Sequence, residues 1–92
     1  MLWLKIKIDL LKALGDKRRL EIINTIGGKK LNVTEIAKNS SVSRSTVSHH
    51  LQILKRNRLV NSHQVGKEIY YSLNTKTIVK VAENLLNFTN QI

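Results

Sequence analysis

Apolar residues recur at helical spacing between residues 42 and 56, and this stretch gives the clearest period in the chain. At about 100° per residue, one edge of such a helix is apolar and the other is polar. The apolar edge consists of Val47, His50, Leu51 and Leu54. The polar edge consists of Ser45, Ser48, His49, Gln52 and Arg56. Hydroxyl and amide groups beside a cation suit a DNA major groove, although an ordinary amphipathic surface helix would show the same pattern.

The chain begins with a segment rich in Leu and Ile. Residues 1–8 alternate like a strand, yet we favour a helix over 1–14, because the apolar residues continue to Leu14 and Gly15 then ends the run. This helix carries more apolar surface than one face of a monomer needs. We therefore expect part of it to be buried against a second chain.

Two more helices are predicted before the polar-edged one. Asp16 is a favourable N-cap for a helix over residues 17–26, which two glycines then end. Asn32 and Glu35 have the spacing of a capping box, which predicts a short third helix. We expect Leu20, Ile23 and Ile26 to face inward from the second helix, and Ile36 and Ala37 from the third. The remaining expected N-caps are Ser43, before the polar-edged helix, and Asn74, before the last helix.

The apolar period falls to two after Arg58, which predicts two strands, 59–64 and 67–73. Because Val65-Gly66 is not a favoured two-residue turn, we expect a looser loop of about three to five residues between them. The inward-facing strand residues would be Val60, Ile69, Tyr71 and Leu73. A last helix follows, from Thr75 to about Asn90. Its apolar stripe consists of Ile78, Val81, Ala82, Leu85, Phe88 or Thr89, and Ile92.

This order of elements predicts a mainly α (α+β) fold, a winged helix-turn-helix that forms a single domain over residues 1–92. The two strands would form a basic hairpin, the wing, directly after the recognition helix. The first and last helices keep apolar faces that no further element covers, so we expect a homodimer. The residues expected at the dimer interface are Trp3, Leu4, Leu11, Val81, Leu85 and Phe88.

The charge balance favours a polyanionic partner. The 92 residues carry a formal net charge of +10, with a pI of about 10.3. A generally cationic, solvated surface would also raise the pI, but no acidic residue lies between Ile36 and Lys67, and that window contains the polar-edged helix. Its cations are Lys38, Arg44, Lys55, Arg56, Arg58 and Lys67.

Each candidate DNA contact has a chemical reason. Gln52 can pair in a bidentate manner with adenine, and the hydroxyls of serine suit several base edges. The expected base-edge contacts are Ser45, Ser48, His49 and Gln52, with Thr46 beside them and Arg44 able to reach a base or a phosphate. Lys38, Arg56 and Lys67 are expected to contact phosphates. His50 lies toward the apolar edge, so we expect it to be a buried, hydrogen-bonded structural residue.

Four segments, taken in order, resemble the ArsR/SmtB family of winged-helix transcriptional regulators. They are LKALGDKRRLEII at residues 11–23, VTEIA at 33–37, SRSTVSHHLQIL at 43–54 and GKEIYYSL at 66–73. The resemblance in order and residues extends over nearly the whole chain. The resemblance implies a homodimer joined through the first and last helices, binding to an inverted-repeat operator in double-stranded DNA, and repression relieved by a signal.

The chain departs from this family where metals would be sensed. Many members bind metal through Cys in the third helix, or through His, Asp and Glu on the last helix. This chain has no Cys, and residues 74–92 contain no His and one carboxylate, Glu83. A tight transition-metal site needs three or four ligands in a fixed geometry. We therefore expect no metal site and no cofactor, and the sequence identifies no inducer.

Other classes of protein have less support. The absence of Cys removes disulfides and thiol nucleophiles, and no apolar run approaches the length of a membrane span, so we expect a cytoplasmic protein without a membrane partner. Six scattered carboxylates and the lack of a glycine-rich phosphate loop argue against an enzyme, and we expect no catalytic residue. Two rivals stay open: an architectural or non-specific nucleic-acid binder, and a winged helix used as a protein-interaction module.

Overall fold

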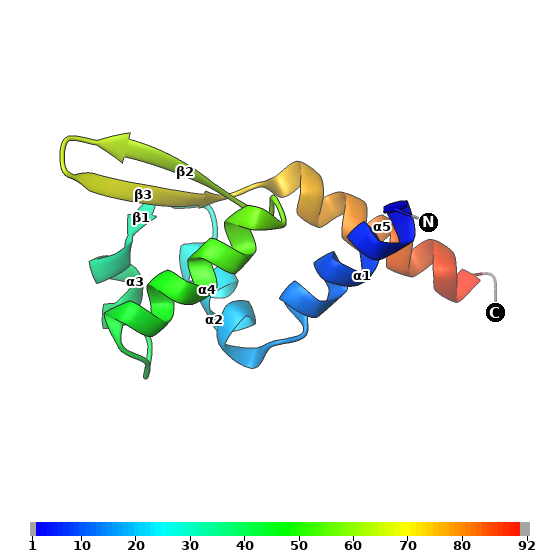
Figure 1. The fold of residues 1–92 in the computed structure, drawn as a ribbon, viewed down its shortest axis with the longest axis horizontal. Helices are drawn as coiled ribbons and strands as arrows, with labels where there is room; N and C mark the ends of the chain where they lie inside the picture. Colours follow the sequence, from blue (N-terminus) through cyan, green and yellow to red (C-terminus); the bar gives the residue numbers. More distant parts are fainter. Residues whose placement is uncertain (1, 91–92) are drawn as a thin grey trace.

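The computed structural model describes residues 2–90, apart from the side chains of residues 3, 6 and 88–90. Helices and strands follow one another in the order predicted for a winged helix-turn-helix (Figure 1). The helices are α1 (Leu2–Leu14), α2 (Lys17–Ile26), α3 (Val33–Lys38), α4 (Arg44–Arg56) and α5 (Thr75–Asn90). The strands are β1 (Leu31–Asn32), β2 (Val60–Val65) and β3 (Glu68–Leu73). The mainly helical fold with a hairpin wing is confirmed.

The wing is part of a small antiparallel sheet of order β1-β3-β2. Strand β1 was not predicted, because two residues are too few to show a period. The expected looser loop in the wing is wrong. Val65 pairs with Glu68, so the turn consists of Gly66 and Lys67 alone. Gly66 has φ +61°, which suits the first position of a two-residue type II′ turn.

The N-terminal end of each central helix is capped as the sequence predicts. The Asp16 carboxylate accepts hydrogen bonds from the backbone N–H groups of Arg18 and Arg19, at 2.8 and 3.4 Å. Asn32 and Glu35 form the full capping box of α3. Residues 2–8 are helical, so the strand alternative for the beginning of the chain is wrong.

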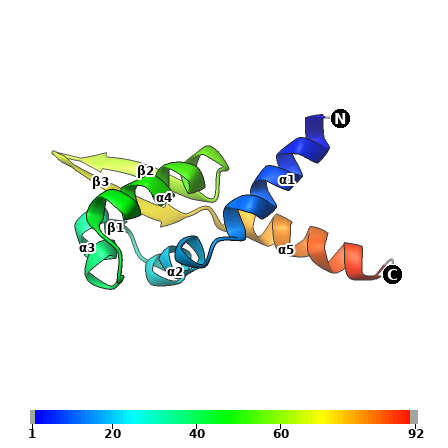
Figure 2. The same cartoon turned by 60° about the horizontal axis from the view of Figure 1, so that its bottom comes forward.

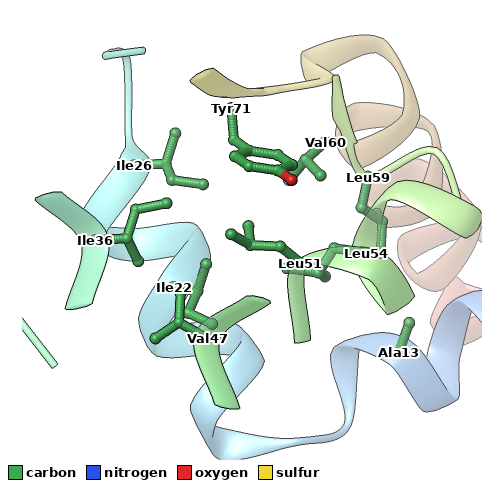
Figure 3. Close-up of a cluster of buried hydrophobic side chains, with 10 residues drawn as sticks. All are labelled: Ala13, Ile22, Ile26, Ile36, Val47, Leu51, Leu54, Leu59, Val60 and Tyr71. Carbon is green, nitrogen blue, oxygen red and sulfur yellow. The ribbon is translucent and has the colours of Figure 1, made fainter. Parts of the chain in front are cut away.

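The apolar core lies between α2, α3, α4 and the wing (Figure 3). Helix α4 contributes Val47, Leu51 and Leu54, all fully buried. Ile22, Ile26, Ile36, Leu59, Val60 and Tyr71 complete the cluster, with Ala13 at its edge. Two predicted core positions are wrong: Leu20 is 49% exposed, with Ile22 facing inward in its place, and Ile69 is exposed because it lies on the part of the wing that extends beyond the core.

Helices α1 and α5 leave the body of the protein at the end opposite the wing tip and diverge from one another (Figure 2). Their apolar residues are only partly covered. Val81 is buried and Ile78 packs against the core, but Leu4, Ile8, Leu11, Val79, Leu85 and Leu86 are exposed. Ala82, expected on the inner stripe, is exposed too. The side chains of the expected interface residues Trp3 and Phe88, and of the stripe positions Thr89 and Ile92, lie outside the described set.

Candidate nucleic-acid interface

Helix α4 divides cleanly into a buried edge and an exposed edge. The buried edge is the one predicted, including His50, which is 6% exposed. Arg44, Ser45, His49, Gln52, Lys55 and Arg56 are exposed, while Thr46 and Ser48 are half-buried. The exposed edge therefore contains the polar and cationic side chains that the sequence placed there.

Hydroxyl groups are gathered at the beginning of α4. The Ser43 hydroxyl accepts a hydrogen bond from the Thr46 backbone N–H at 3.3 Å, as expected of an N-cap. The same oxygen lies 3.1 Å from the Ser45 hydroxyl and 3.0 Å from the Thr46 hydroxyl. Ser45 and Thr46 are thus already held by the cap, so either would have to exchange or share a hydrogen bond to contact a base.

The middle of the exposed edge is unpaired. Within the described part of the chain, the side chains of Ser48, His49 and Gln52 form no intramolecular hydrogen bond. The His49 ring has only a tilted contact with the His50 ring, at 5.7 Å between centroids. Their polar atoms are therefore free for water or a ligand. Gln52 is exposed, and its amide carries a donor group and an acceptor side by side, which is the arrangement that pairs with adenine in a bidentate manner.

Cations surround this edge. Lys38 ends α3, Arg44 begins α4, Arg56 ends it, and Lys67 lies in the turn of the wing; all four are exposed. None of them forms an ion pair with any residue that the structure describes. A surface with several unpaired cations and no carboxylate between residues 36 and 67 attracts a polyanion.

Arg19 connects three helices, a role that sequence analysis did not reveal. Its Nε donates to the Ala13 carbonyl at 2.6 Å, and its Nη2 donates to the Lys12 carbonyl at 3.1 Å. Its Nη1 lies 3.9 Å from the Asp16 carboxylate and 3.3 Å from Nδ1 of His50. One side chain thereby joins the end of α1, the beginning of α2 and the buried edge of α4.

The contact with Arg19 fixes the state of His50. A guanidinium only donates hydrogen bonds, so Nδ1 must accept and the ring must be the neutral Nε2–H tautomer. Burial lowers the pKa of His50, and the charges of Arg19, His49 and Arg18 lower it further, against the opposing charge of Asp16. His50 is thus the buried, hydrogen-bonded residue predicted from its place on the apolar edge.

Asp16 is held in its charged form. Desolvation raises its pKa, but the backbone N–H groups of Arg18 and Arg19 and the charges of Arg19 and His50 outweigh it, and the pKa of Asp16 is lowered overall. A charged carboxylate at the beginning of α2 also interacts favourably with the helix dipole. The connection between α1 and α2 is therefore held by charged Asp16 and Arg19 together with the neutral ring of His50.

The described residues offer little to a metal ion. No three His, Asp or Glu side chains among residues 2–90, in the part that the structure describes, are grouped so that they could hold one. The chain also has no Cys. Among those same residues, no helix is both long and apolar enough to cross a membrane.

A hairpin wing beside a helix with an exposed polar edge defines a winged helix-turn-helix protein of the DNA-binding class. Residues 16–62 match the family model described as bacterial regulatory protein, arsR family. The chain belongs to the ArsR family and is a DNA-binding transcriptional regulator. This family consists of regulators, so the prediction that the chain is not an enzyme is confirmed.

Individual relatives agree with this assignment. The chain is 35% identical over 83 residues to the transcriptional repressor SdpR of Bacillus subtilis, covering 90% of this chain and 92% of that protein. An ArsR-like transcriptional regulator from Rhodococcus has the same fold, with a TM-score of 0.86, 27% identity, and coverage of 99% of this chain and 86% of that one. A homodimeric winged helix-turn-helix DNA-binding domain from Mycobacterium bovis gives a TM-score of 0.80 at 25% identity, with coverage of 99% and 85%.

Proposed function

We propose that this chain is a homodimeric repressor that binds an inverted-repeat operator in double-stranded DNA. The observation that carries the proposal is the exposed edge of α4, where Gln52, His49 and Ser48 are unpaired and cations lie at both ends of the helix. Two such helices, related by a two-fold axis, would enter successive major grooves about 34 Å apart. The whole of 1–92 would act as one DNA-binding domain, in the cytoplasm with its DNA.

The base contacts and the phosphate contacts have separate roles. Ser45, Ser48, His49 and Gln52, with Thr46 and Arg44, would face base edges, and Gln52 has the bidentate geometry that discriminates adenine. Lys38, Arg56 and Lys67 would hold the phosphates on either side. Lys67, in the two-residue turn at the tip of the wing, would contact phosphates at the outer end of the site.

The dimer would form through α1 and α5. Leu4, Leu11 and Leu85 are exposed in the single chain, although each belongs to an otherwise apolar helix edge. The M. bovis domain, which matches nearly this whole chain, is a homodimer. Val81, by contrast, is 7% exposed within one chain, so it would support the interface from beneath rather than form its contact surface.

Repression is proposed because SdpR, which this chain matches over nearly its full length, is a repressor. The control would not depend on the family's thiolate or α5 metal sites. The chain has no Cys, and the described residues contain no metal-binding group. We therefore assign no metal and no cofactor to the regulatory step.

The test compares two single variants on two kinds of DNA. A duplex selected by the wild-type protein and a mixed-sequence duplex are titrated at one salt concentration. Gln52→Ala should lose about 1–3 kcal/mol of preference for the selected duplex, since a bidentate pair is worth that much. Lys67→Ala should weaken binding to both duplexes by a similar factor.

Three results would count against the proposal. If both variants bind both duplexes as the wild type does, the reading surface lies elsewhere on the molecule. A wild-type preference close to one would favour a non-specific or architectural binder. No binding to any duplex at low salt would favour a protein-interaction module.

A further inference from the structure

Arg58 has a backbone conformation that an arginine rarely adopts. Its φ is +59°, and it is the only non-glycine residue with a positive φ among residues 2–90. It follows Asn57, the C-cap of α4. Left-handed backbone is costly for any residue with a Cβ, and helices that end this way usually have glycine at this position.

The hydrogen bonds around Arg58 explain why the backbone must turn there. The Arg58 N–H donates to the Lys55 carbonyl at 3.0 Å, and the Leu59 N–H donates to the Leu54 carbonyl at 2.9 Å. These two bonds are the Schellman motif, which requires the left-handed residue between them. Leu59 is fully buried, and its carbonyl accepts from the Asn74 N–H at 2.9 Å. The position is therefore fixed by the fold and cannot relax to suit an arginine.

The side chain of Arg58 does nothing for the fold that would compensate for this strain. It is exposed, and it forms no hydrogen bond or ion pair with any residue that the structure describes. A cation near the end of a helix interacts favourably with the dipole, but Lys55 and Arg56 already occupy the last turn of α4. Glycine at this position would serve the fold better, so an arginine here points to a role outside the chain.

We propose that Arg58 is a phosphate-binding residue at the C-terminal end of the recognition helix. This inference rests on the proposed function, in which α4 lies in the major groove. The backbone of Arg58 is held by the Schellman bonds and by the buried Leu59, so the residue is presented from a rigid support. A guanidinium on such a support binds phosphate in a bidentate manner and loses less conformational entropy than one on a mobile loop.

If Arg58 binds phosphate from a strained backbone, replacing it with glycine should raise stability and weaken DNA binding. Arg58→Gly should raise the melting temperature by about 4 °C, because glycine adopts the left-handed conformation without strain. The same variant should bind DNA more weakly. The slope of log affinity against log salt should fall in magnitude by about 1.8, since each dimer loses two phosphate contacts. A merely structural role would move stability and binding in the same direction.

The measurements use the full chain and a mixed-sequence duplex, because phosphate contacts do not depend on sequence. Arg58→Lys keeps the charge and should keep both the wild-type slope and the wild-type melting temperature. Lys29→Gln removes one charge from the loop between α2 and β1 and should leave the slope unchanged. An unchanged slope and affinity for Arg58→Gly would overturn the inference, and so would a lower melting temperature, which would show that no strain is relieved.

Failure of this inference is distinguishable from failure of the proposed function. The wild-type preference for a selected duplex over a mixed-sequence duplex is measured in the same titrations. If that preference is high while Arg58→Gly behaves as the wild type does, the repressor stands and Arg58 has no part in binding. If the wild type shows no preference, the proposed function fails and the role of Arg58 in a reading helix fails with it.

Discussion

Helices α4 and α5 carry similar apolar stripes but use them differently. The stripe of α4 is covered completely: Val47, Leu51 and Leu54 are fully buried within the chain. On α5, Val81 is buried, whereas Val79, Leu85 and Leu86 are 52%, 47% and 64% exposed. Figure 1 shows the reason, since α4 packs between α2, α3 and the wing, while α5 extends away from them.

The two helices differ because the apolar surface of α4 is buried within one chain, whereas that of α5 would need a second chain to bury it. The core around α4 is complete within one chain, so the polar edge of α4 is positioned before any partner binds. The α1–α5 end leaves Leu4, Leu11 and Leu85 39%, 45% and 47% exposed, so burying the remaining surface of each would gain about 1 kcal/mol. A second copy that covers this end would also place two reading helices at a fixed spacing.

The largest expected effect on stability comes from a substitution in the core around α4, which is complete within one chain. Leu51→Ala should lower the free energy of unfolding by about 3 kcal/mol, because it leaves a cavity in a fully packed core. Urea unfolding measures this loss. Gln52→Ala, the exposed neighbour, is the matched control and should change stability by less than about 0.5 kcal/mol. Equal losses for the two variants would mean that α4 is not packed as described.

A substitution on the exposed apolar surface of α1 and α5 should instead change the dissociation constant of the dimer. Leu85→Lys should weaken the dimer by about 30-fold, which corresponds to about 2 kcal/mol shared between two half-buried leucines. Sedimentation at several protein concentrations measures the dissociation constant. Asn84→Lys adds the same charge one position away and should have a smaller effect. If Leu85→Lys leaves the dimer intact, another face of α5 or a different helix forms the interface.

The smallest expected effect concerns His50, which Arg19 connects to the end of α1 and the beginning of α2. The pKa of His50 is lowered mainly by burial, so its neutral ring contributes stability above the unfolded pKa of about 6.5. That contribution is lost as the pH falls through the lower, folded pKa. Wild-type stability should therefore fall between about pH 7.5 and pH 5 more steeply than that of His50→Gln.

Urea unfolding at both pH values provides the comparison. His63→Gln gives the control, because His63 is exposed on the wing and does not contribute to the lowered pKa of His50, so this variant should follow the wild-type profile. Parallel profiles for the wild type and His50→Gln would contradict the description of a neutral, buried ring. The lowered pKa of Asp16 acts in a separate window, below its ordinary value of 3.8, and does not disturb this test.

The sequence predicts those parts of the structure that depend on local patterns. The caps Asp16, Asn32 and Ser43 and the two edges of α4 follow from spacing and side-chain chemistry, and all are found in the structure. The buried position of His50 follows from the same helical count. Predictions about interface residues and individual DNA contacts stay predictions.

Features that depend on tertiary contacts could not be predicted. Strand β1 exists only because it pairs with β3. The role of Arg19 depends on two carbonyl groups at the end of α1, which α1 and the turn after it must bring back toward α2, and on the His50 ring in α4, which is remote from Arg19 in sequence. Leu20 and Ile22 both have helical spacing to other apolar residues, and packing against α4 decides which of them is buried. In the sequence, Arg58 is one of several cations between residues 36 and 67, and only its φ in the structure distinguishes it from the others.

The most direct test of the account is a selection of bound duplexes from a random pool by the wild-type protein. The account predicts enrichment of an inverted repeat whose half-sites lie about one helical turn apart, because two α4 helices related by the α1–α5 interface must reach successive major grooves. Pools that stay random after repeated rounds would contradict it. So would enrichment of a single half-site without its inverted partner.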